Sequence, residues 1–226
     1  MFVDRVDAGV HLAEELNAKP VIAEATPSDL LVLSIPRGGV VVGQAVAQGL
    51  GCTHDVIVVR KIGFPSYDEL AVGAVAEDGP IFLNNAMLAQ NQLNEADLTA
   101  QVLRARSRVS HYIHLFRANK PLELADKLVI LVDDGVATGE TMKAAIRWVE
   151  SRRETSAIRG VLVAVPVCSL AVSGDMAKLV DDFVCLYTPR RFYAVGQFYR
   201  QFEQVSDREV LALLYSQQHT DVPSDG

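Results

Sequence analysis

The chain has 226 residues, of which 50% are apolar and 22% charged. That composition suits one globular domain with a sizeable core, and it excludes a disordered, collagenous or coiled-coil chain. Its 28 acidic residues outnumber the 21 basic ones and give a net charge of −7. This balance argues against a general nucleic-acid partner, because neutralising phosphates supplies most of the affinity of such proteins.

The first residues lack a basic segment followed by an apolar one, and no run of about 18 uncharged apolar residues follows. The three cysteines, Cys52, Cys168 and Cys185, lack metal-ligand spacing and lie in apolar stretches, so we interpret them as reduced, packed thiols. We therefore expect a soluble, cytoplasmic protein with no membrane partner.

Continuous apolar runs alternate with helical patterns along the chain. Such runs are typical of parallel strands that are buried on both faces. They predict strands at residues 30–35, 56–59, 129–132, 161–165 and 183–187. The alternation predicts right-handed crossovers and an α/β fold with a central parallel sheet of about five strands flanked by helices.

Helical spacing occurs in three segments next to these strands. Residues 40–50 are small and apolar, which suits a helix packed closely on a sheet. A buried stripe at i, i+3, i+4 and i+7 is predicted after the third run by Met142, Ala145, Ile146 and Val149. A similar repeat predicts an N-terminal helix whose buried residues are Val6, Val10, Ala13 and Leu16.

Two regions interrupt the alternation. Residues 70–77 and 80–83 flank Asp78-Gly79, a turn signal that predicts a β-hairpin. Residues 94–120 predict one long helix, with Asn94 as its N-cap and Pro121 just beyond its end. The apolar stripe of this helix is Leu98, Val102, Ala105, Val109, Tyr112 and Phe116.

The last half of this long helix is basic, through Arg104, Arg106, Arg108, Arg117 and Lys120. We interpret the basic half as a solvated face or an oligomer contact, and expect a homodimer. Residues 1–216 are predicted to form a single domain. The polar residues 217–226 are predicted to be a disordered tail.

The stretch that carries the chemistry has the sequence VILVDDGVATGET and begins at Val129. A predicted buried strand ends there in Asp133 and Asp134, and Thr-Gly-x-Thr occupies the start of the next helix. Free amides and the positive end of the helix dipole at such a start form a phosphate cradle. Neighbouring strand residues face opposite ways, so the two acids have different roles: binding sugar hydroxyls, or holding Mg²⁺ through water.

The alternative is an ordinary capped strand–helix turn. It is disfavoured because adjacent carboxylates at the end of a buried strand are costly unless they have partners. Other phosphate and nucleophile motifs are missing: the sequence has no P-loop, no Gly-x-Gly-x-x-Gly after the first strand and no Gly-x-Ser-x-Gly.

The motif resembles the phosphoribosyl pyrophosphate (PRPP) binding motif of the type I phosphoribosyltransferases. The resemblance extends over residues 30–83 and 126–210, and residues 84–125 resemble a helical insertion in a group of bacterial predicted phosphoribosyltransferases. It implies the type I phosphoribosyltransferase fold, with a flexible-loop hairpin and a small C-terminal hood over residues 189–208.

The resemblance also implies site residues. PRPP would contact one continuous segment: Asp133, Asp134, Gly135, Val136, Ala137, Thr138, Gly139, Glu140 and Thr141. Pyrophosphate would meet two loops that follow the first and second strands and contain Arg37, Gly38, Arg60 and Lys61. The residues implied as catalytic are Arg37, Lys61, Asp133 and Asp134, the last two also holding Mg²⁺ through water. The acceptor would meet Phe192, Tyr193 and Val195 in the hood.

Two conformational features are implied as well. One is a cis peptide bond between Pro36 and Arg37, the alternative being a trans bond with Arg37 reaching outwards. The other is a loop over residues 64–70 that is mobile without ligand.

Several positions depart from the purine-specific pattern. Ala137 stands where hypoxanthine-guanine enzymes often have an aspartate, so that base-contacting carboxylate is missing. Tyr199 and Arg200 stand near the place of another acidic residue, and Glu140 must turn its carboxylate away from a bound phosphate. Four hood aromatics fit core packing and acceptor stacking equally well: Phe192, Tyr193, Phe198 and Tyr199.

The implied reaction is Mg²⁺-dependent transfer of the 5-phosphoribosyl group from PRPP to a nitrogenous acceptor, with release of pyrophosphate. A nucleobase is one candidate acceptor, which would place the protein in nucleotide salvage. The first alternative is a PRPP-sensing regulator that binds without turnover, because fold and ligand do not establish catalysis. A second alternative is hydrolysis of a phosphoribosyl compound.

Overall fold

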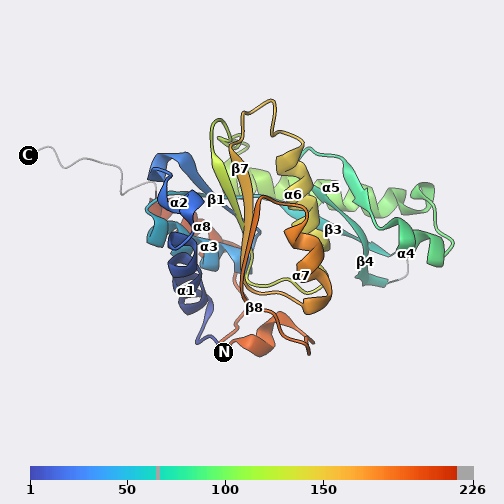
Figure 1. Ribbon diagram of the computed structural model, residues 1–226. Helices are drawn as coiled ribbons and strands as arrows, with labels where there is room; N and C mark the ends of the chain where they lie inside the picture. Colours follow the sequence, from blue (N-terminus) through green and yellow to red (C-terminus); the bar gives the residue numbers. More distant parts are fainter. Residues whose placement is uncertain (65–66, 218–226) are drawn as a thin grey trace, which may run out of the picture.

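A parallel five-stranded sheet forms the centre of the protein in the computed structural model, which describes residues 1–64 and 67–217 (Figure 1). The strand order is β2-β1-β6-β7-β8 and every neighbouring pair is parallel, which confirms the predicted α/β class. The strands are β1 (Leu30–Ser34), β2 (Thr53–Val56), β6 (Leu128–Val132), β7 (Gly160–Val167) and β8 (Asp182–Tyr187).

The strand predicted at residues 56–59 is wrong. Val56 ends β2, and Val59 begins β3 (Val59–Phe64), which belongs to a different sheet. Ile57 and Val58 cross between the two sheets and are both fully buried. An apolar run reports burial, and burial alone does not distinguish a strand from a buried crossing between sheets.

Helices cover both faces of the central sheet. α1 (Arg5–Asn17), α2 (Pro20–Ala23) and α3 (Gly38–Leu50) contribute to one core, and α6 (Glu140–Glu150) and α7 (Leu170–Ala177) to the other. The stripe predicted for α6 is buried throughout. The N-terminal stripe is half wrong, because Val6 and Val10 are 52% and 47% exposed while Ala8 and Leu12 are buried. Small residues face α3 here: a Cβ on Gly9 would lie 2.6 Å from Ala45 Cβ.

The sheet has a topological switch point between β1 and β6. The chain leaves β1 through α3 towards β2 in one direction, and leaves β6 through α6 towards β7 in the other. Ser34 at the end of β1 pairs with Val132 at the end of β6, so their following loops start side by side. Open α/β sheets bind ligands in the crevice at such a point.

A three-stranded antiparallel sheet projects from this body, in the order β3-β4-β5. β4 (Tyr67–Ala76) and β5 (Ile81–Leu83) form the predicted hairpin around Asp78-Gly79. β3 pairs with the other edge of β4. Of the loop predicted to be mobile, Phe64 ends β3 and Tyr67 begins β4, while residues 65–66 lie outside the described residues.

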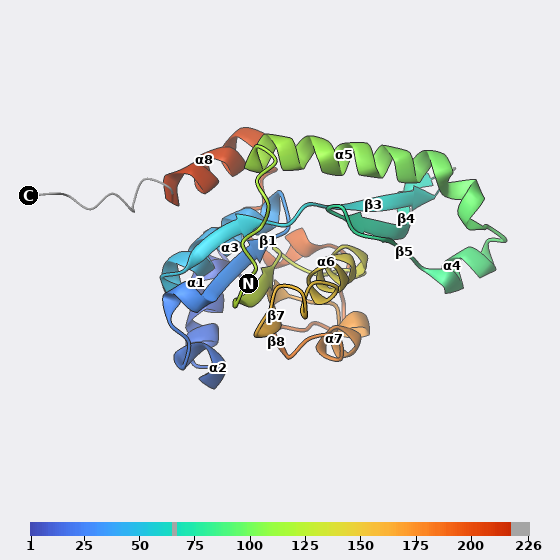
Figure 2. The same cartoon turned by 90° about the horizontal axis from the view of Figure 1, so that it is seen from above.

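The insertion folds onto this second sheet. It contains α4 (Asn85–Gln90), the short 3₁₀ helix η2 (Glu95–Leu98) and α5 (Thr99–Arg117), which lies along β3 and β4 in Figure 2. The prediction of one helix over 94–120 is wrong at both ends. Asn94 and Asp97 cap η2 rather than an α-helix, and Ala118 ends α5 in a left-handed conformation.

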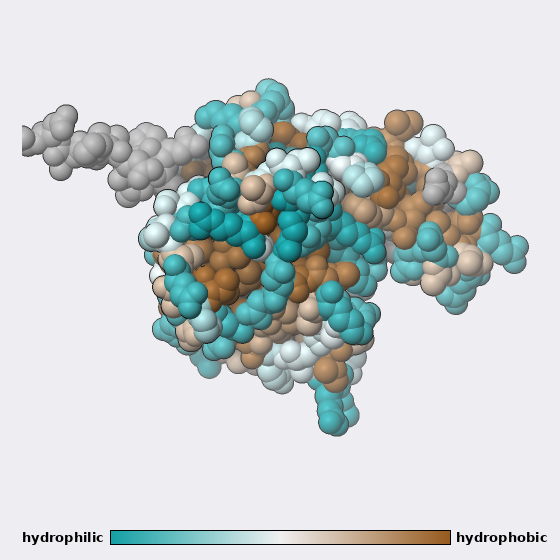
Figure 3. Space-filling view, turned by 45° about the horizontal axis from the view of Figure 1, so that its top comes forward, coloured by the Kyte–Doolittle hydropathy of each residue, from teal (hydrophilic) through white to brown (hydrophobic). Residues whose placement is uncertain are grey.

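Four residues of the stripe predicted for the long helix are buried, namely Leu98, which ends η2, and Ala105, Val109 and Phe116 of α5, while Val102 and Tyr112 are half-buried. Apolar side chains also reach the surface of this module, seen in brown on the right of Figure 3. A groove of about 690 Å³ lies there, between the hairpin and the start of α5.

The C-terminal part contains the hood and α8 (Asp207–Gln217). The hood includes the short 3₁₀ helix η3 (Val195–Phe198). A further 3₁₀ helix, η1 (Pro27–Asp29), lies outside the hood, directly before β1. Of the tail predicted over residues 217–226, Gln217 ends α8 and residues 218–226 lie outside the described residues. No helix in the described part of the chain is both long and apolar enough to span a bilayer. All three cysteines are free.

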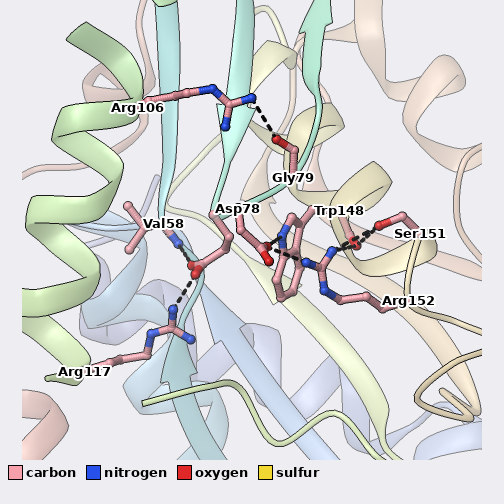
Figure 4. Close-up of polar contacts among 9 residues, drawn as sticks. Val58, Asp78, Gly79, Arg106, Arg117, Trp148, Ser151 and Arg152 are labelled. Carbon is pink, nitrogen blue, oxygen red and sulfur yellow. Dashed lines mark hydrogen bonds and ion pairs between the residues drawn. The ribbon is translucent and has the colours of Figure 1, made fainter. Parts of the chain in front are cut away.

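A buried ion pair ties the end of β4 to the end of α5. Arg117 donates to Glu77 (Figure 4), and both side chains are buried, each only 5% exposed. Glu77 also accepts a 2.7 Å hydrogen bond from the backbone N–H of Val58, where the chain enters the second sheet. The sequence pattern predicted Arg117 to lie on a solvated face or in an oligomer contact. For Arg117 this prediction is wrong, because the side chain is buried in the ion pair with Glu77.

We expect Arg117→Gln to lower the free energy of unfolding by about 3–5 kcal/mol, because it leaves the buried Glu77 carboxylate without its cation. The matched control is Arg152→Gln, which breaks the pair with the 78% exposed Asp78 carboxylate (Figure 4) and should cost about 1 kcal/mol or less. Chemical denaturation measures both. Equal losses in the two variants would contradict this assignment.

A second buried polar group supports the loop after β1. His54 lies with Nε2 2.8 Å from Ser34 Oγ and Nδ1 3.0 Å from Gln44 Oε1. Burial lowers the pKa of His54 to about 3. The folded protein therefore keeps this imidazole neutral at pH values where an unfolded chain protonates it.

The sign of the resulting pH dependence is fixed. Below pH ~6.5, the usual histidine pKa, protonation stabilises only the unfolded chain, so acid favours unfolding down to the folded-state pKa of about 3. We expect up to about a tenfold rise in the unfolding constant per pH unit from this residue. His54→Gln should lose that contribution between pH 7 and pH 5 in denaturant titrations. An unchanged pH slope in the variant would refute it.

Candidate active site

The loops after β1 and β6 meet in direct contact at the switch point. A Cβ on Gly38 would lie 1.9 Å from Asp134 Oδ2, and one on Gly39 would lie 2.9 Å from Asp133 Cα. Only glycine allows this approach without a shift. The Pro36–Arg37 peptide just before these glycines is cis, as the family resemblance implied.

The start of α6 is open for an anion. Gly139 precedes it with φ +80°, and no side chain of the described residues caps this end. A cavity of about 150 Å³ lies over it, lined by the β6–α6 loop and by Lys61 and Val195. Uncapped amides and the dipole make such an end electropositive. Thr138 and Thr141 line the same cavity, so their hydroxyls are available as further donors.

Asp133 is the carboxylate that lines this cavity. Burial, followed by the negative charge of Asp134, raises its pKa well above the usual range, and Lys61 opposes the rise. Its Oδ1 accepts a 2.8 Å hydrogen bond from the backbone N–H of Asp134. An ionised Asp133 is thus short of positive charge in the protein alone, and suited to a ligand that brings hydroxyl donors or a cation.

Asp134 instead is held by the protein. Arg5 Nε donates to its Oδ2 at 2.8 Å, and the Tyr199 hydroxyl donates to its backbone carbonyl at 2.6 Å. The Arg5 guanidinium in turn lies 3.8 Å from the ring centroid of Phe202 and donates to the Glu203 carbonyl. The pKa of Asp134 is raised by burial and lowered by Arg5, with a net rise.

Arg5 is a site residue that sequence reasoning missed, and Tyr199 was predicted only to pack in the core or stack on the acceptor, not to hold Asp134. They lie 129 and 65 positions from Asp134, and neither stands in a motif. The one hint was the cost of two adjacent buried carboxylates, which required a cation without saying where it lies in the chain.

Of the three cations predicted to meet pyrophosphate, only Lys61 lines the cavity. Arg37 points towards α8, with Nη1 3.8 Å from Asp207 Oδ1. Arg60 folds onto α5, its guanidinium 4.1 Å from the Tyr112 ring centroid.

The hood places its aromatic residues in different surroundings. Phe192 packs on the buried Phe198, with ring centroids 5.2 Å apart, inside a small core. Tyr193 is 85% exposed, whereas Tyr199 is buried. Val195 lines the cavity and touches the β6–α6 loop: a Cβ on Gly135 would lie 2.6 Å from its Cγ1. Core packing therefore accounts for Phe198 and Tyr199.

The remaining residues of the motif form the wall of the cavity. Val136 is buried and its N–H donates to the carbonyl of Val167, which fixes the turn against β7. Ala137 is exposed at the rim. The Glu140 carboxylate lies 3.8 Å from Lys143, one turn further along α6, in line with the expectation that it turns away from the cradle.

Comparison with known proteins places this geometry in a family. The sequence profile of the phosphoribosyl transferase domain matches residues 4–184. The chain belongs to this family. The recognition made from the VILVDDGVATGET motif is thus confirmed, and so is the type I fold.

Relatives share most of this phosphoribosyltransferase chain. A protein of Mycobacterium tuberculosis H37Rv with the name "Putative phosphoribosyl transferase" is 38% identical over 215 residues, or 95% of the chain. The chain spans only 46% of that protein's length. The crystal structure of TT1426 from Thermus thermophilus is 37% identical and covers 95% of this chain and 98% of its own, with a TM-score of 0.72.

A more distant structure shares the fold alone. The AQ2163 protein from Aquifex aeolicus is 12% identical, with a TM-score of 0.50, and covers 94% of this chain and 85% of its own.

The oxygen donors fit Mg²⁺ only together with a substrate. In the part of the chain that the structure describes, no three His, Cys, Asp or Glu side chains form a metal-binding group. Asp133 is free to face the cavity while Asp134 is paired with Arg5. Mg²⁺ is commonly held by one or two carboxylates, water and substrate phosphates, and this arrangement suits that mode.

We expect Gly38→Ala to lower the free energy of unfolding by about 1–3 kcal/mol, because its Cβ would overlap Asp134 Oδ2 and displace it from Arg5. The matched control is Gly174→Ala in α7, where a Cβ meets nothing within 4 Å and helix propensity should stabilise by up to about 1 kcal/mol. Thermal denaturation compares the two. A tolerated Gly38→Ala would show that this contact is not needed.

Proposed function

We propose that this protein transfers the 5-phosphoribosyl group of PRPP to a nitrogenous acceptor and releases pyrophosphate, with Mg²⁺ bound alongside PRPP. The observation that carries the proposal is the uncapped start of α6 over a cavity that Asp133 and Lys61 also line. A phosphate at the helix start, ribose hydroxyls at the carboxylate and a diphosphate at the lysine require those three features in one place.

The 5-phosphate would bind the amides and hydroxyls from Thr138 to Thr141. Asp133 would accept hydrogen bonds from the ribose hydroxyls, since it faces the cavity. Asp134 would act as a positioning residue, because Arg5 and Tyr199 hold it and it fixes Gly38 beside it.

Displacement at the anomeric carbon builds positive charge on the ribose and negative charge on the leaving diphosphate. Lys61 lines the cavity and would bind the diphosphate, and the backbone amides of Gly38 and Gly39 would donate to it from the start of α3. Arg37 would have to leave Asp207 to take part. When bound, Mg²⁺ would be held through water by Asp133, since Arg5 occupies the Asp134 carboxylate, and it would neutralise charge on the diphosphate.

The acceptor would enter beside Val195, a hood residue that lines the cavity. Phe192 and Tyr193 would form its outer wall. The missing acidic residue at Ala137 makes purine recognition of the hypoxanthine type a poor fit. The protein would act as a homodimer.

Turnover is tested by incubating the protein with Mg²⁺ and PRPP and a panel of nucleobases and amines, and following pyrophosphate release. We expect release that depends on one class of acceptor. Tight PRPP binding with no release for any acceptor would instead support the sensing regulator. Release without an acceptor would support hydrolysis.

We expect Asp133→Asn to weaken PRPP binding by roughly ten- to a hundredfold, since it removes a charged hydrogen-bond acceptor. Calorimetry with PRPP and Mg²⁺ measures the affinity. The matched control is Asp175→Asn, which changes a 63% exposed carboxylate on α7 and should leave the affinity unaltered. Unchanged affinity in Asp133→Asn would remove this residue from the ribose site.

A further inference from the structure

A second cavity shares Lys61 with the cavity over the start of α6. Its volume is about 320 Å³, and it opens to the surface between the edge strand β3 and the insertion helix α5, where Lys61, Arg104 and Arg108 are exposed. The other residues that line the second cavity include Gly63, Gln101, Arg104, Ser107 and Arg108.

The cavity gathers positive charge in an acidic protein. Arg104 and Arg108 stand at i and i+4 on α5 and both line it, together with Lys61. Like charges at this spacing destabilise a helix unless something neutralises them. Among the side chains that the structure describes (residues 1–64 and 72–215, without Glu95), no carboxylate forms an ion pair with any of the three, although the chain as a whole carries −7.

The electrostatic surroundings agree with this grouping. Burial lowers the pKa of the neighbouring Arg60, and the charges of Arg108 and Arg37 lower it further, while Tyr112 opposes the shift. The positive charges of α5 and β3 thus act on one another across this edge of the second sheet.

A buried polar group completes the wall. Gln101 is only 8% exposed, and its Oε1 has no hydrogen-bond partner among the described residues. A buried carbonyl oxygen without a donor costs stability. A ligand with an O–H or N–H group would satisfy it, while Arg104, Arg108 and Lys61 would take the anionic part.

We infer that this cavity is a second anion site, which binds the phosphate group of a small phosphorylated ligand distinct from the PRPP in the cradle. Guanidinium groups match phosphate oxygens through paired donors, and three cations suit a dianion or a polyphosphate. The volume lies within the range of small-molecule sites. Shared Lys61 would link occupancy of this site to the diphosphate end of PRPP.

The test is calorimetry with inorganic phosphate, pyrophosphate and tripolyphosphate as probes, without metal, on the full chain. The variants are Arg104→Gln with Arg108→Gln, which remove the charges of the second cavity, and Thr138→Val with Thr141→Val, which alter the cradle. The matched control for net charge is Lys120→Gln with Lys178→Gln, both exposed. Circular dichroism checks that each variant is folded.

We expect wild type to bind two equivalents of pyrophosphate, and the arginine double variant to lose one of them by at least tenfold in affinity. The cradle variant should lose the other, and the lysine control neither. Wild type mixed first with PRPP should still bind one equivalent. Tighter binding of tripolyphosphate would identify a polyphosphate ligand, and equal affinities a single phosphate ester.

Two results separate this inference from the proposed function. Identical pyrophosphate binding by wild type and the arginine double variant would overturn the second site, whatever the cradle does. Loss of binding in the arginine variant, with no effect of the cradle variant or of PRPP, would support the second site and contradict the cradle. No binding to wild type at all would overturn both.

Discussion

Two adjacent carboxylates at the end of a buried strand impose the constraint on which this site depends. Burial raises the pKa of both Asp133 and Asp134, and the negative charge of Asp134 raises that of Asp133 further. The protein satisfies only one of them, through Arg5. The other faces a cavity whose remaining walls are amides, hydroxyls and a lysine. The site is thus prepared for a ligand that carries hydroxyl donors next to phosphate.

That arrangement requires three distant parts of the chain. α1 supplies the cation, the start of α3 supplies two glycines that fit against the carboxylates, and the hood supplies Tyr199 and Val195. Each contact fixes the position of another: Arg5 rests on Phe202 of the hood while it holds Asp134. The N-terminal helix, which also covers one face of the sheet, and the C-terminal segment are therefore both part of the site.

The insertion changes what the second sheet can do. The hairpin is tied to α5 by the Glu77–Arg117 pair and to α6 by the contact of Asp78 with Trp148. Lys61 of β3 lines both the cavity over the start of α6 and the cavity beside α5. A helix that packs its apolar stripe on the sheet also has a polar side to offer, and in α5 that side is basic where it meets Lys61.

The sequence by itself determined the class of fold, most of the central strands, the α6 stripe and the PRPP motif, because burial and helix starts leave local patterns of residues. It did not place β3, since a fully buried run over residues 56–59 has the same composition whether it continues a strand or crosses between sheets. The sequence pattern predicted Val6 and Val10 to be buried, but they are exposed. The face of α1 that packs against α3 instead carries small residues such as Gly9, which allow the two helices to approach closely. Only the tertiary structure brought Arg5 to Asp134 and Arg104 and Arg108 to Lys61, since contacts between residues far apart in sequence follow from how the elements pack, which no local pattern records.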